Sequence, residues 1–439
     1  MDRHSPDRLE KMRQQFETAP YPRVPLDRSP KNDVGDLFIH NLVTSYYLKN
    51  QTIPETTGKV ILDAGCGSGY KSLILAEANP GARIVGIDIS EESVKLARQR
   101  LWHHGFDNAE FHAIAIEALA TLNLQFDYIN ADEVLYLLPN VDLGLQILKS
   151  VLKPDGILRG NLHSSLQRVH YFRAQKVFRL LGLTGEAPQD LEIQLVRDTM
   201  DALKDEVWLK NTTWKPHFAE RDEGILANYL LQGDQGFSIP EMFSLLRTAQ
   251  LELVSMVQWP QWQLANLFND PDNLPIFLGL TLPDLSLEDS LHLFELIAPF
   301  HRLLDFWCAH PCQNTAPIPI EEWQQADWQQ AQACLHPQLQ TPAFHTKLLA
   351  AIEKKERFEI GQHFPLVGGP LAIDRDAAAM LRPLLDGTAL VSSLVEEYQQ
   401  WRSDIATSQN DEERQSALEI VVSVLTVLAH YGYVLLERL

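Results

Sequence analysis

The stretch KVILDAGCGSGYKS, residues 59–72, places Gly65, Gly67 and Gly69 between a short apolar run and a segment of helical composition. Glycine tolerates left-handed backbone and lets another group come close to the main chain. Two interpretations are open: a turn that only needs small residues, or a loop that admits a ligand. Parallel sheets bind ligands at the carboxyl ends of their strands, so the position of this loop favours a ligand.

Short β-rich runs and helical segments alternate around this loop. Ser90 is expected to cap the helix over 90–104, with Glu91 and Glu92 in its first turn, where the helix dipole favours negative charge. This alternation predicts a parallel sheet with helices on both faces. The expected strands are 59–64, 82–88, 109–114, 126–131 and 156–162, and the other expected helices are 72–78 and 141–152.

The pattern changes after this region. Residues 165–232 are expected to be helical, and residues 238–259 to form one helix and one strand, so the helical part reads as an insertion within the fold. Residues 282–309 are again expected to be helical. Prolines 311, 317 and 319 then predict a boundary, and the chain end reads as a helix stopped by Gly432 and a short strand over 433–437.

Composition excludes several classes of function. The chain has 439 residues, with 58 acidic and 37 basic side chains and a formal net charge of −21, which argues against nucleic acid and would suit a basic partner. The N-terminus lacks the apolar core of a signal peptide, and the most apolar run, 420–429, is about half as long as a bilayer requires. We therefore expect a cytoplasmic protein without a membrane span.

The cysteines do not indicate a disulfide framework or a metal site. Four cysteines are few for a chain of this length, and their spacing relative to His310 and His336 does not match a usual zinc pattern. We expect reduced thiols and no metal. The cysteines are Cys66, Cys308, Cys312 and Cys334.

Asp88 adds a second point of contact for a ligand. It ends the second expected strand, about twenty residues after the loop, where a carboxylate can hold both hydroxyls of a ribose. A dinucleotide would require G-x-G-x-x-G, but Gly69 follows Gly65 by four positions and Tyr70 occupies the fifth. The spacing therefore favours a nucleoside cofactor without a pyrophosphate.

The segments VILDAGCGSGYKS, IVGIDIS, FDYINADEVLYLLP and LKPDGILRGNLHS, in this order, resemble the motifs of class I S-adenosylmethionine-dependent methyltransferases. The resemblance implies S-adenosyl-L-methionine as cofactor and an α/β fold with a doubly wound, mostly parallel, Rossmann-like sheet of seven strands. The family commonly has an acid where this chain has Ala115. From the methionyl end through the ribose to the adenine, the implied cofactor residues are Asp63, Gly65, Gly67, Asp88, Ile89, Ile116 and Glu117, with Asn130 on the methyl side.

Polar residues at and after the fourth expected strand are the catalytic candidates. Methyl transfer is an in-line displacement, and a nitrogen nucleophile must also lose a proton. Asn130, Asp132, Glu133 and Tyr136 are placed to orient or deprotonate an acceptor amine. The alternative is that Asp132 and Glu133 cap the next helix and Tyr136 belongs to the core. Related sequences often carry a histidine pair where Tyr136 and Leu137 stand.

Segments outside this core carry two further resemblances. QQFETAPYPRVP and LHLFELIAPFHRLLDFWCAHP resemble a bacterial group of methyltransferases whose N-terminal segment folds over the cofactor. This resemblance makes Tyr21 a candidate lid residue, with a packing role as the alternative. Residues 364–398 are similar to the regulatory domain of bacterial protein-lysine methyltransferases that modify outer-membrane proteins. The similarity implies a winged-helix-like α+β module that shapes substrate access or pairs two chains as a homodimer.

The predicted organisation is an N-terminal lid and helical segment over 1–55, a methyltransferase domain over 56–312 with its helical insertion at 165–232, and a smaller C-terminal domain over 313–439 that regulates or recognises the substrate. The predicted activity is methyl transfer to a protein, with lysine amines favoured by the acidic composition. Two alternatives stay open: a small-molecule methyltransferase, and a non-catalytic protein that uses the fold as a scaffold or sensor.

Overall fold

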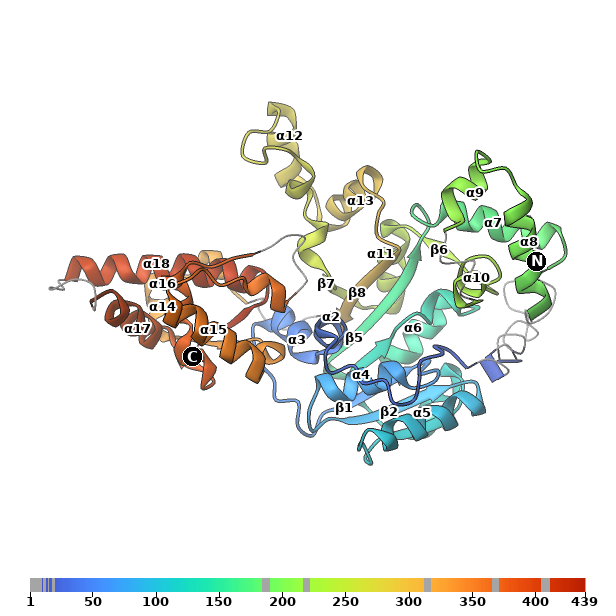
Figure 1. The fold of residues 1–439 in the computed structure, drawn as a ribbon, viewed down its shortest axis with the longest axis horizontal. Coiled ribbons are helices and arrows are strands. Elements are labelled where there is room, and N and C mark those ends of the chain that lie inside the picture. Colours follow the sequence, from blue (N-terminus) through green and yellow to red (C-terminus); the bar gives the residue numbers. More distant parts are fainter. Residues whose placement is uncertain are drawn as a thin grey trace.

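A large sheet and a small sheet form the two halves of an elongated molecule. The computed structural model describes residues 10, 13–14, 16–17, 20–183, 190–215, 222–311, 317–364, 371–403 and 411–438. The C-terminal helices lie at one end of the molecule and the helices of residues 169–228 at the other, with the large sheet between them (Figure 1).

The large sheet has the order β3-β2-β1-β4-β5-β8-β7, and a short strand, β6, pairs with β5 outside this path. The first five strands are parallel, whereas β8 runs antiparallel to both β5 and β7. The predicted doubly wound, mostly parallel α/β sheet is confirmed. The strands are β1 Val60–Ala64, β2 Arg83–Asp88, β3 Glu110–Ala113, β4 Phe126–Ala131, β5 Leu152–Ser164, β6 Gly236–Phe237, β7 Glu252–Met256 and β8 Leu303–Ala309.

Helices cover both faces of this sheet because each presents an apolar side to it. Helices α6 and α11 join one apolar cluster, and α3, α4 and α5 join another. Ser90 caps α5 as predicted, its hydroxyl accepting the Ser93 N–H at 3.1 Å. Both hydrogen bonds of a capping box link Ser238 and Glu241 at the start of α11. These helices are α2 Val34–His40, α3 Leu42–Asn50, α4 Tyr70–Ala78, α5 Glu91–His103, α6 Val141–Ser150 and α11 Ile239–Ala249.

The prediction that residues 282–309 are helical is wrong in its second half. Helix α13, Leu287–Ile297, is present, but Leu303–Ala309 form β8 between β5 and β7. Side chains of β8 belong to the apolar clusters on both faces of the sheet, so its apolar run cannot be told from a buried helix by periodicity. Strand β5 also begins earlier than predicted, because Leu152 already pairs with Phe126 of β4. The pairing resumes at Ile157 after an irregular stretch.

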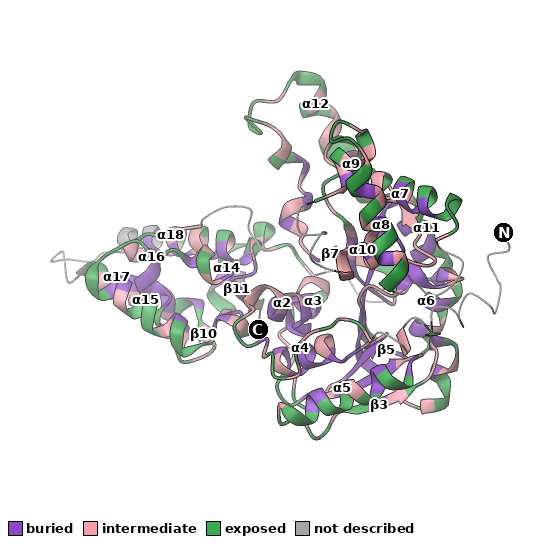
Figure 2. Ribbon diagram, turned by 45° about the vertical axis from the view of Figure 1, so that its right-hand side comes forward, coloured by how far each residue is buried: buried purple, intermediate pink, exposed green. Residues whose placement is uncertain are grey.

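The segment after residue 164 is helical, as predicted. Its helices pack around an apolar cluster of their own that includes Phe178, Val196 and Tyr229. Helix α12, Ile276–Thr281, projects away from the rest of the molecule and has no buried residue (Figure 2). The helices of the segment are α7 Val169–Leu180, α8 Asp190–Ala202, α9 Trp208–Thr213 and α10 Asp222–Asn228.

The C-terminal part is an α+β unit with its own antiparallel sheet, ordered β10-β9-β11. Phe38 of α2 belongs to its apolar core, so α2 joins this unit to the large sheet. Gly432, at φ +74°, ends the last helix before β11, as predicted. No described helix combines the length and apolar character that crossing a bilayer requires. The unit contains β9 Ala331–Leu335, β10 Ala389–Leu390, β11 Val434–Arg438, α14 Gln325–Gln330, α15 Pro342–Lys354, α16 Arg375–Met380, α17 Val391–Ser403 and α18 Asp411–His430.

Candidate active site

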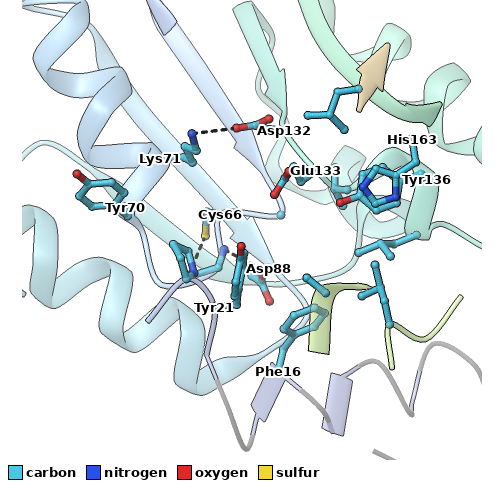
Figure 3. Close-up of a pocket in the computed structure, with 18 of the residues that line it drawn as sticks. Phe16, Tyr21, Cys66, Tyr70, Lys71, Asp88, Asp132, Glu133, Tyr136 and His163 are labelled. Carbon is cyan, nitrogen blue, oxygen red and sulfur yellow. Dashed lines mark hydrogen bonds and ion pairs between the residues drawn. The ribbon is translucent and has the colours of Figure 1, made fainter. Parts of the chain in front are cut away.

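A cavity of about 1270 Å³ lies at the carboxyl ends of the parallel strands. Gly65 and Gly67 follow β1, Asp88 ends β2, residues 132–138 follow β4, and His163 lies near the end of β5. The N-terminal segment and the helices α8 and α10 complete the wall. The strand order therefore brings together residues that are far apart in the chain (Figure 3).

At Gly67 the glycine loop has no room for a side chain because the protein's own N-terminal segment touches it. A Cβ on Gly67 would lie 2.1 Å from the carbonyl oxygen of Tyr21, and Gly67 has φ +49°. The Ser68 N–H donates to the same oxygen at 2.8 Å, and the Ser68 hydroxyl donates to the Pro22 carbonyl at 2.7 Å. Arg100 of α5 holds the segment further along by donating to the carbonyls of Val24 and Pro25. Residues 20–25, part of the predicted lid, are therefore bound to the loop through their backbone.

The cavity next to Asp88 fits a nucleoside. One carboxylate oxygen of Asp88 accepts the Gly67 N–H at 3.0 Å and the other accepts the Ser90 N–H at 2.9 Å. A carboxylate has about four acceptor positions, so two are left for the hydroxyls of a ribose. Burial raises the pKa of Asp88. Ile89 and Ile116 line the cavity near it and provide an apolar surface for a base, with Glu117 at the edge.

Asp63 and Asn130 lie beneath the cavity and are not among the residues that line it. Asp63 accepts from the Ser72 hydroxyl at 2.5 Å and from the Asn130 amide at 2.9 Å, and Arg159 donates to the other end of that amide. Burial raises the pKa of Asp63 to about 6. In this structure the two side chains support the loop and β4 from below.

Asp132 is held in a buried network of charges. Arg159 donates to it at 3.4 Å, and Lys71 lies 3.5 Å from its other oxygen. Arg159 also forms a two-pronged ion pair with Asp305 of β8, and His40 of α2 lies 3.6 Å from Asp132. These cations hold the pKa of Asp132 well below its usual value, against the effect of its burial. Asp132 is therefore a poor proton acceptor.

Glu133 has an unusual backbone and a cationic partner. Its φ of +56° is rare for a residue other than glycine, and its N–H donates to the Asn161 amide oxygen at 2.8 Å. Its carboxylate is ion-paired with Arg302. In Figure 3, Glu133 is drawn between the loop with Asp88 and the aromatic pair of Tyr136 and His163.

Tyr136 and His163 stack on each other at the far side of the cavity. Their ring centroids are 3.7 Å apart, with an interplanar angle of 20°. Burial raises the pKa of Tyr136 well above its usual value, so its hydroxyl stays protonated at neutral pH. Nδ1 of His163 lies 2.6 Å from the carboxylate of Asp234.

Most of the predicted site residues come together in this cavity, and several important neighbours were missed. His163 could have been suspected because it lies near the carboxyl end of a predicted strand, as Asp88 does. Arg302 and Asp305 gave no such signal, since their segment was expected to be helical. The predicted residues that line the cavity are Tyr21, Gly65, Gly67, Asp88, Ile89, Ile116, Glu117, Asp132, Glu133 and Tyr136.

The described cysteines, Cys66, Cys308 and Cys334, are buried free thiols. Among the residues that the structure describes, no three His, Cys, Asp or Glu side chains are grouped to hold a metal ion. Cys312 lies outside the described residues.

The fold and this cavity define a class of protein. Residues 55–218 match a family model described as a methyltransferase domain. This match confirms the predicted methyltransferase domain, and the cofactor of that predicted class is S-adenosyl-L-methionine.

Individual relatives match either most of the chain or about a quarter of it. An uncharacterised protein of Synechococcus sp. is 26% identical over 317 residues, which are 71% of this chain and 73% of that protein. The ubiquinone biosynthesis O-methyltransferase of Leptothrix cholodnii is 33% identical over 107 residues, or 24% of this chain and 45% of that enzyme, so this match spans less than half of the relative. The solved structure of PKMT2 from Rickettsia typhi has a TM-score of 0.59 at 15% identity, covering 91% of this chain and 74% of that one, and it shares the fold.

Proposed function

We propose that this protein transfers a methyl group from S-adenosyl-L-methionine to a protein, with the amine of a lysine side chain as the favoured acceptor. The bound cofactor supplies the methyl group on a positively charged sulfur. Asp88 would hold its ribose, and the glycine loop and lid would enclose its amino-acid tail. The remaining cavity has room for an acceptor side chain, because about 1270 Å³ exceeds the roughly 300–1,000 Å³ of an ordinary ligand pocket.

The observation that carries the lysine assignment is the charge around Tyr21. Burial raises the pKa of its hydroxyl, and the carboxylates of Glu133, after β4, and Glu223, on α10, raise it further, whereas the positive charges of Arg302 and Lys71 act against them. Glu223 and Asp190 of the cavity wall have no ion-pair partner among the described residues. A cation that enters beside Tyr21 would meet these carboxylates and the face of an aromatic ring, both of which favour an ammonium group.

The C-terminal unit supports a macromolecular acceptor. It packs on α2, whose Asp36 and His40 line the cavity while Phe38 lies in the C-terminal core. We propose that residues 313–439 shape access of the acceptor to the cavity or pair two chains as a homodimer. The PKMT2 fold extends over 91% of this chain, and therefore beyond the methyltransferase domain.

A second candidate acceptor is a small phenol, because curated relatives of the domain are ubiquinone biosynthesis O-methyltransferases. One experiment separates the two. The purified chain is incubated with methyl-labelled S-adenosyl-L-methionine and, in parallel, with poly-L-lysine, poly-L-arginine, free lysine and catechol. We expect label on poly-L-lysine, recovered as methyl-lysine after hydrolysis.

Three results would contradict the proposal. Label on catechol alone would favour the small-molecule enzyme. Label on free lysine but not on the polymer would exclude a protein acceptor. A chain that binds S-adenosylhomocysteine in calorimetry but labels no acceptor would favour the non-catalytic scaffold or sensor. An Asp88→Ala variant serves as the control for transfer that depends on the bound cofactor.

A further inference from the structure

His163 has a fixed tautomer. Asp234 accepts from its Nδ1 at 2.6 Å, and the other oxygen of Asp234 accepts from Arg168 at 3.1 Å and from Gln175 at 2.8 Å. The side chain of Asp234 is fully buried, with 0% exposure, and its pKa is lowered by the hydrogen bond from His163 and by nearby positive charge, against the effect of burial. An ionised carboxylate only accepts, so the proton of the neutral imidazole is on Nδ1 and the lone pair is on Nε2.

The other candidates for a proton acceptor are each occupied. Asn130 lies beneath the cavity, Asp132 is neutralised by Arg159 and Lys71, and the Tyr136 hydroxyl stays protonated. Glu133 is paired with Arg302. Among the described residues at the far side of the cavity, His163 presents an unprotonated nitrogen whose orientation is held from both sides, by Asp234 and by the stacked ring of Tyr136.

We propose that Nε2 of His163 is the atom that takes the proton from the protonated acceptor amine, and that Asp234 is the positioning residue that keeps this nitrogen unprotonated. This inference rests on the proposed transfer to an amine. A lysine amine is an ammonium ion at neutral pH, and one of its N–H bonds breaks and leaves the electron pair on a neutral nitrogen, while the proton bonds to Nε2 and gives an imidazolium. The nitrogen pair then forms the bond to the methyl carbon as the carbon–sulfur bond breaks and leaves its pair on sulfur. The imidazolium returns its proton to water.

Arg302 marks the place where the acceptor would lie. One of its nitrogens donates to Nε2 of His163 at 3.1 Å, and another is paired with Glu133. Its side chain is 46% exposed, whereas that of His163 is 2% exposed, so Arg302 is the partner that can move. An acceptor amine would replace Arg302 as the hydrogen-bond donor to Nε2, while Arg302 stays ion-paired with Glu133.

The charges that face His163 keep it neutral at physiological pH. Burial lowers its pKa to about 4, and the positive charges of Arg168 and Arg302 act in the same direction, whereas Asp234 acts against them. The stacked Tyr136 is uncharged at neutral pH. Nε2 is therefore unprotonated throughout the neutral range. A proton acceptor works best with a pKa near the working pH, and an acceptor that displaces Arg302 from Nε2 removes one of the positive charges that lower the pKa of His163.

A kinetic comparison tests the role. His163→Asn should lower kcat on poly-L-lysine by about 100-fold or more, the range of general-base catalysis, while the Kd of S-adenosylhomocysteine stays within about threefold of wild type. Asp234→Asn should lower kcat similarly, because an amide can donate to Nδ1 and move the proton to Nε2. Added imidazole should restore part of the rate of His163→Gly, which a structural role would not allow. An unchanged kcat in His163→Asn would overturn the proposal.

The matched control is His292→Asn. Its Nδ1 also lies close to a carboxylate, 2.8 Å from Glu295, but on α13 and outside the cavity. We expect its kcat to equal that of wild type. An equal loss in the control and in His163→Asn would show a general effect on folding and would also overturn the proposal.

Nuclear magnetic resonance separates this inference from the proposed function. In the chain with ¹⁵N-labelled histidine and bound S-adenosylhomocysteine, the His163 signals are assigned by their loss in His163→Asn. We expect a protonated Nδ1 and an unprotonated Nε2 at pH 7, and a shift of the Nε2 signal when n-butylamine is added. A protonated Nε2, or no shift with n-butylamine, refutes the inference even if wild type methylates none of the tested acceptors. Wild type without transfer, but with the expected shift, refutes the proposed function alone.

Discussion

Replacement of Gly67 by alanine tests whether the lid, closed over the glycine loop, is part of the cofactor site. Alanine at φ +49° costs about 1–2 kcal/mol in left-handed backbone. Its Cβ would lie 2.1 Å from the Tyr21 carbonyl oxygen, which is backbone, so the lid must withdraw. Withdrawal breaks the two hydrogen bonds from Ser68 to the lid, each worth about 0.5–1.5 kcal/mol.

The closed state therefore loses about 1–3 kcal/mol relative to the open one, beyond the backbone cost. At about 1.4 kcal/mol for each factor of ten, the Kd of S-adenosylhomocysteine should rise by about 10- to 100-fold in calorimetry. The control is Gly105→Ala, since Gly105 has φ +87° and no atom within 4 Å of an added Cβ. Gly105→Ala should lose about 1–2 kcal/mol in the free energy of unfolding, measured with urea, and Gly67→Ala about 2–5 kcal/mol, because its two hydrogen bonds to the lid are lost as well. If Gly67→Ala binds as tightly as Gly105→Ala, the lid is not part of the cofactor site.

Three further predictions follow from the same structure. Asp88→Asn keeps the size of the side chain but weakens its hydrogen bonds to the ribose, so the Kd of S-adenosylhomocysteine should rise by about 10- to 100-fold; unchanged affinity would remove Asp88 from the ribose site. The double variant Asp190→Asn with Glu223→Gln should raise the KM for poly-L-lysine several-fold at constant kcat, and a fall in kcat alone would contradict a role in attracting the acceptor. Burial lowers the pKa of His336 to about 3, whereas an unfolded histidine titrates near pH 6.5. Between these pH values the unfolded chain binds one more proton than the folded chain. The free energy of unfolding therefore falls by about 1.4 kcal/mol per pH unit on acidification. His336→Gln should reduce this slope, measured by urea unfolding between pH 4 and pH 6, by one proton; an unchanged slope would give His336 an ordinary pKa.

The fold was predictable where local pattern reflects local structure. Strands β1 to β4, the second part of β5 and helices α4 to α6 were expected close to their observed places, because each carries turn or capping residues at its ends and a periodicity of its own. Strand β8 was missed because it lies between β5 and β7, and both of these strands are distant from it in the sequence. The apolar pattern of a segment indicates how buried it is, but not which neighbouring segments bury it.

The residues of the site were likewise predictable only where they depend on local sequence and not on distant partners. Asp88 and the glycine loop were predicted because the carboxyl ends of parallel strands meet at one edge of a sheet. The placement of Asn130 beneath the cavity was not predictable, since it depends on partners from β1 and β5. The pairing of His163 with Asp234 joins β5 to the residues after α10, across 71 positions of the chain.

The sequence by itself determined the class of fold and the edge of the sheet at which the cavity lies, because glycines and carboxylates at strand ends have their effect wherever a parallel sheet forms. Only the tertiary structure decided which polar side chains face the cavity and in which protonation state. A pKa and a tautomer depend on burial and on charges within a few ångströms, and in this protein Arg302, Asp234 and Asp305 reach the site from segments far from the glycine loop. The bare backbone of Gly67 likewise has its reason in Tyr21, a residue that precedes the sheet altogether.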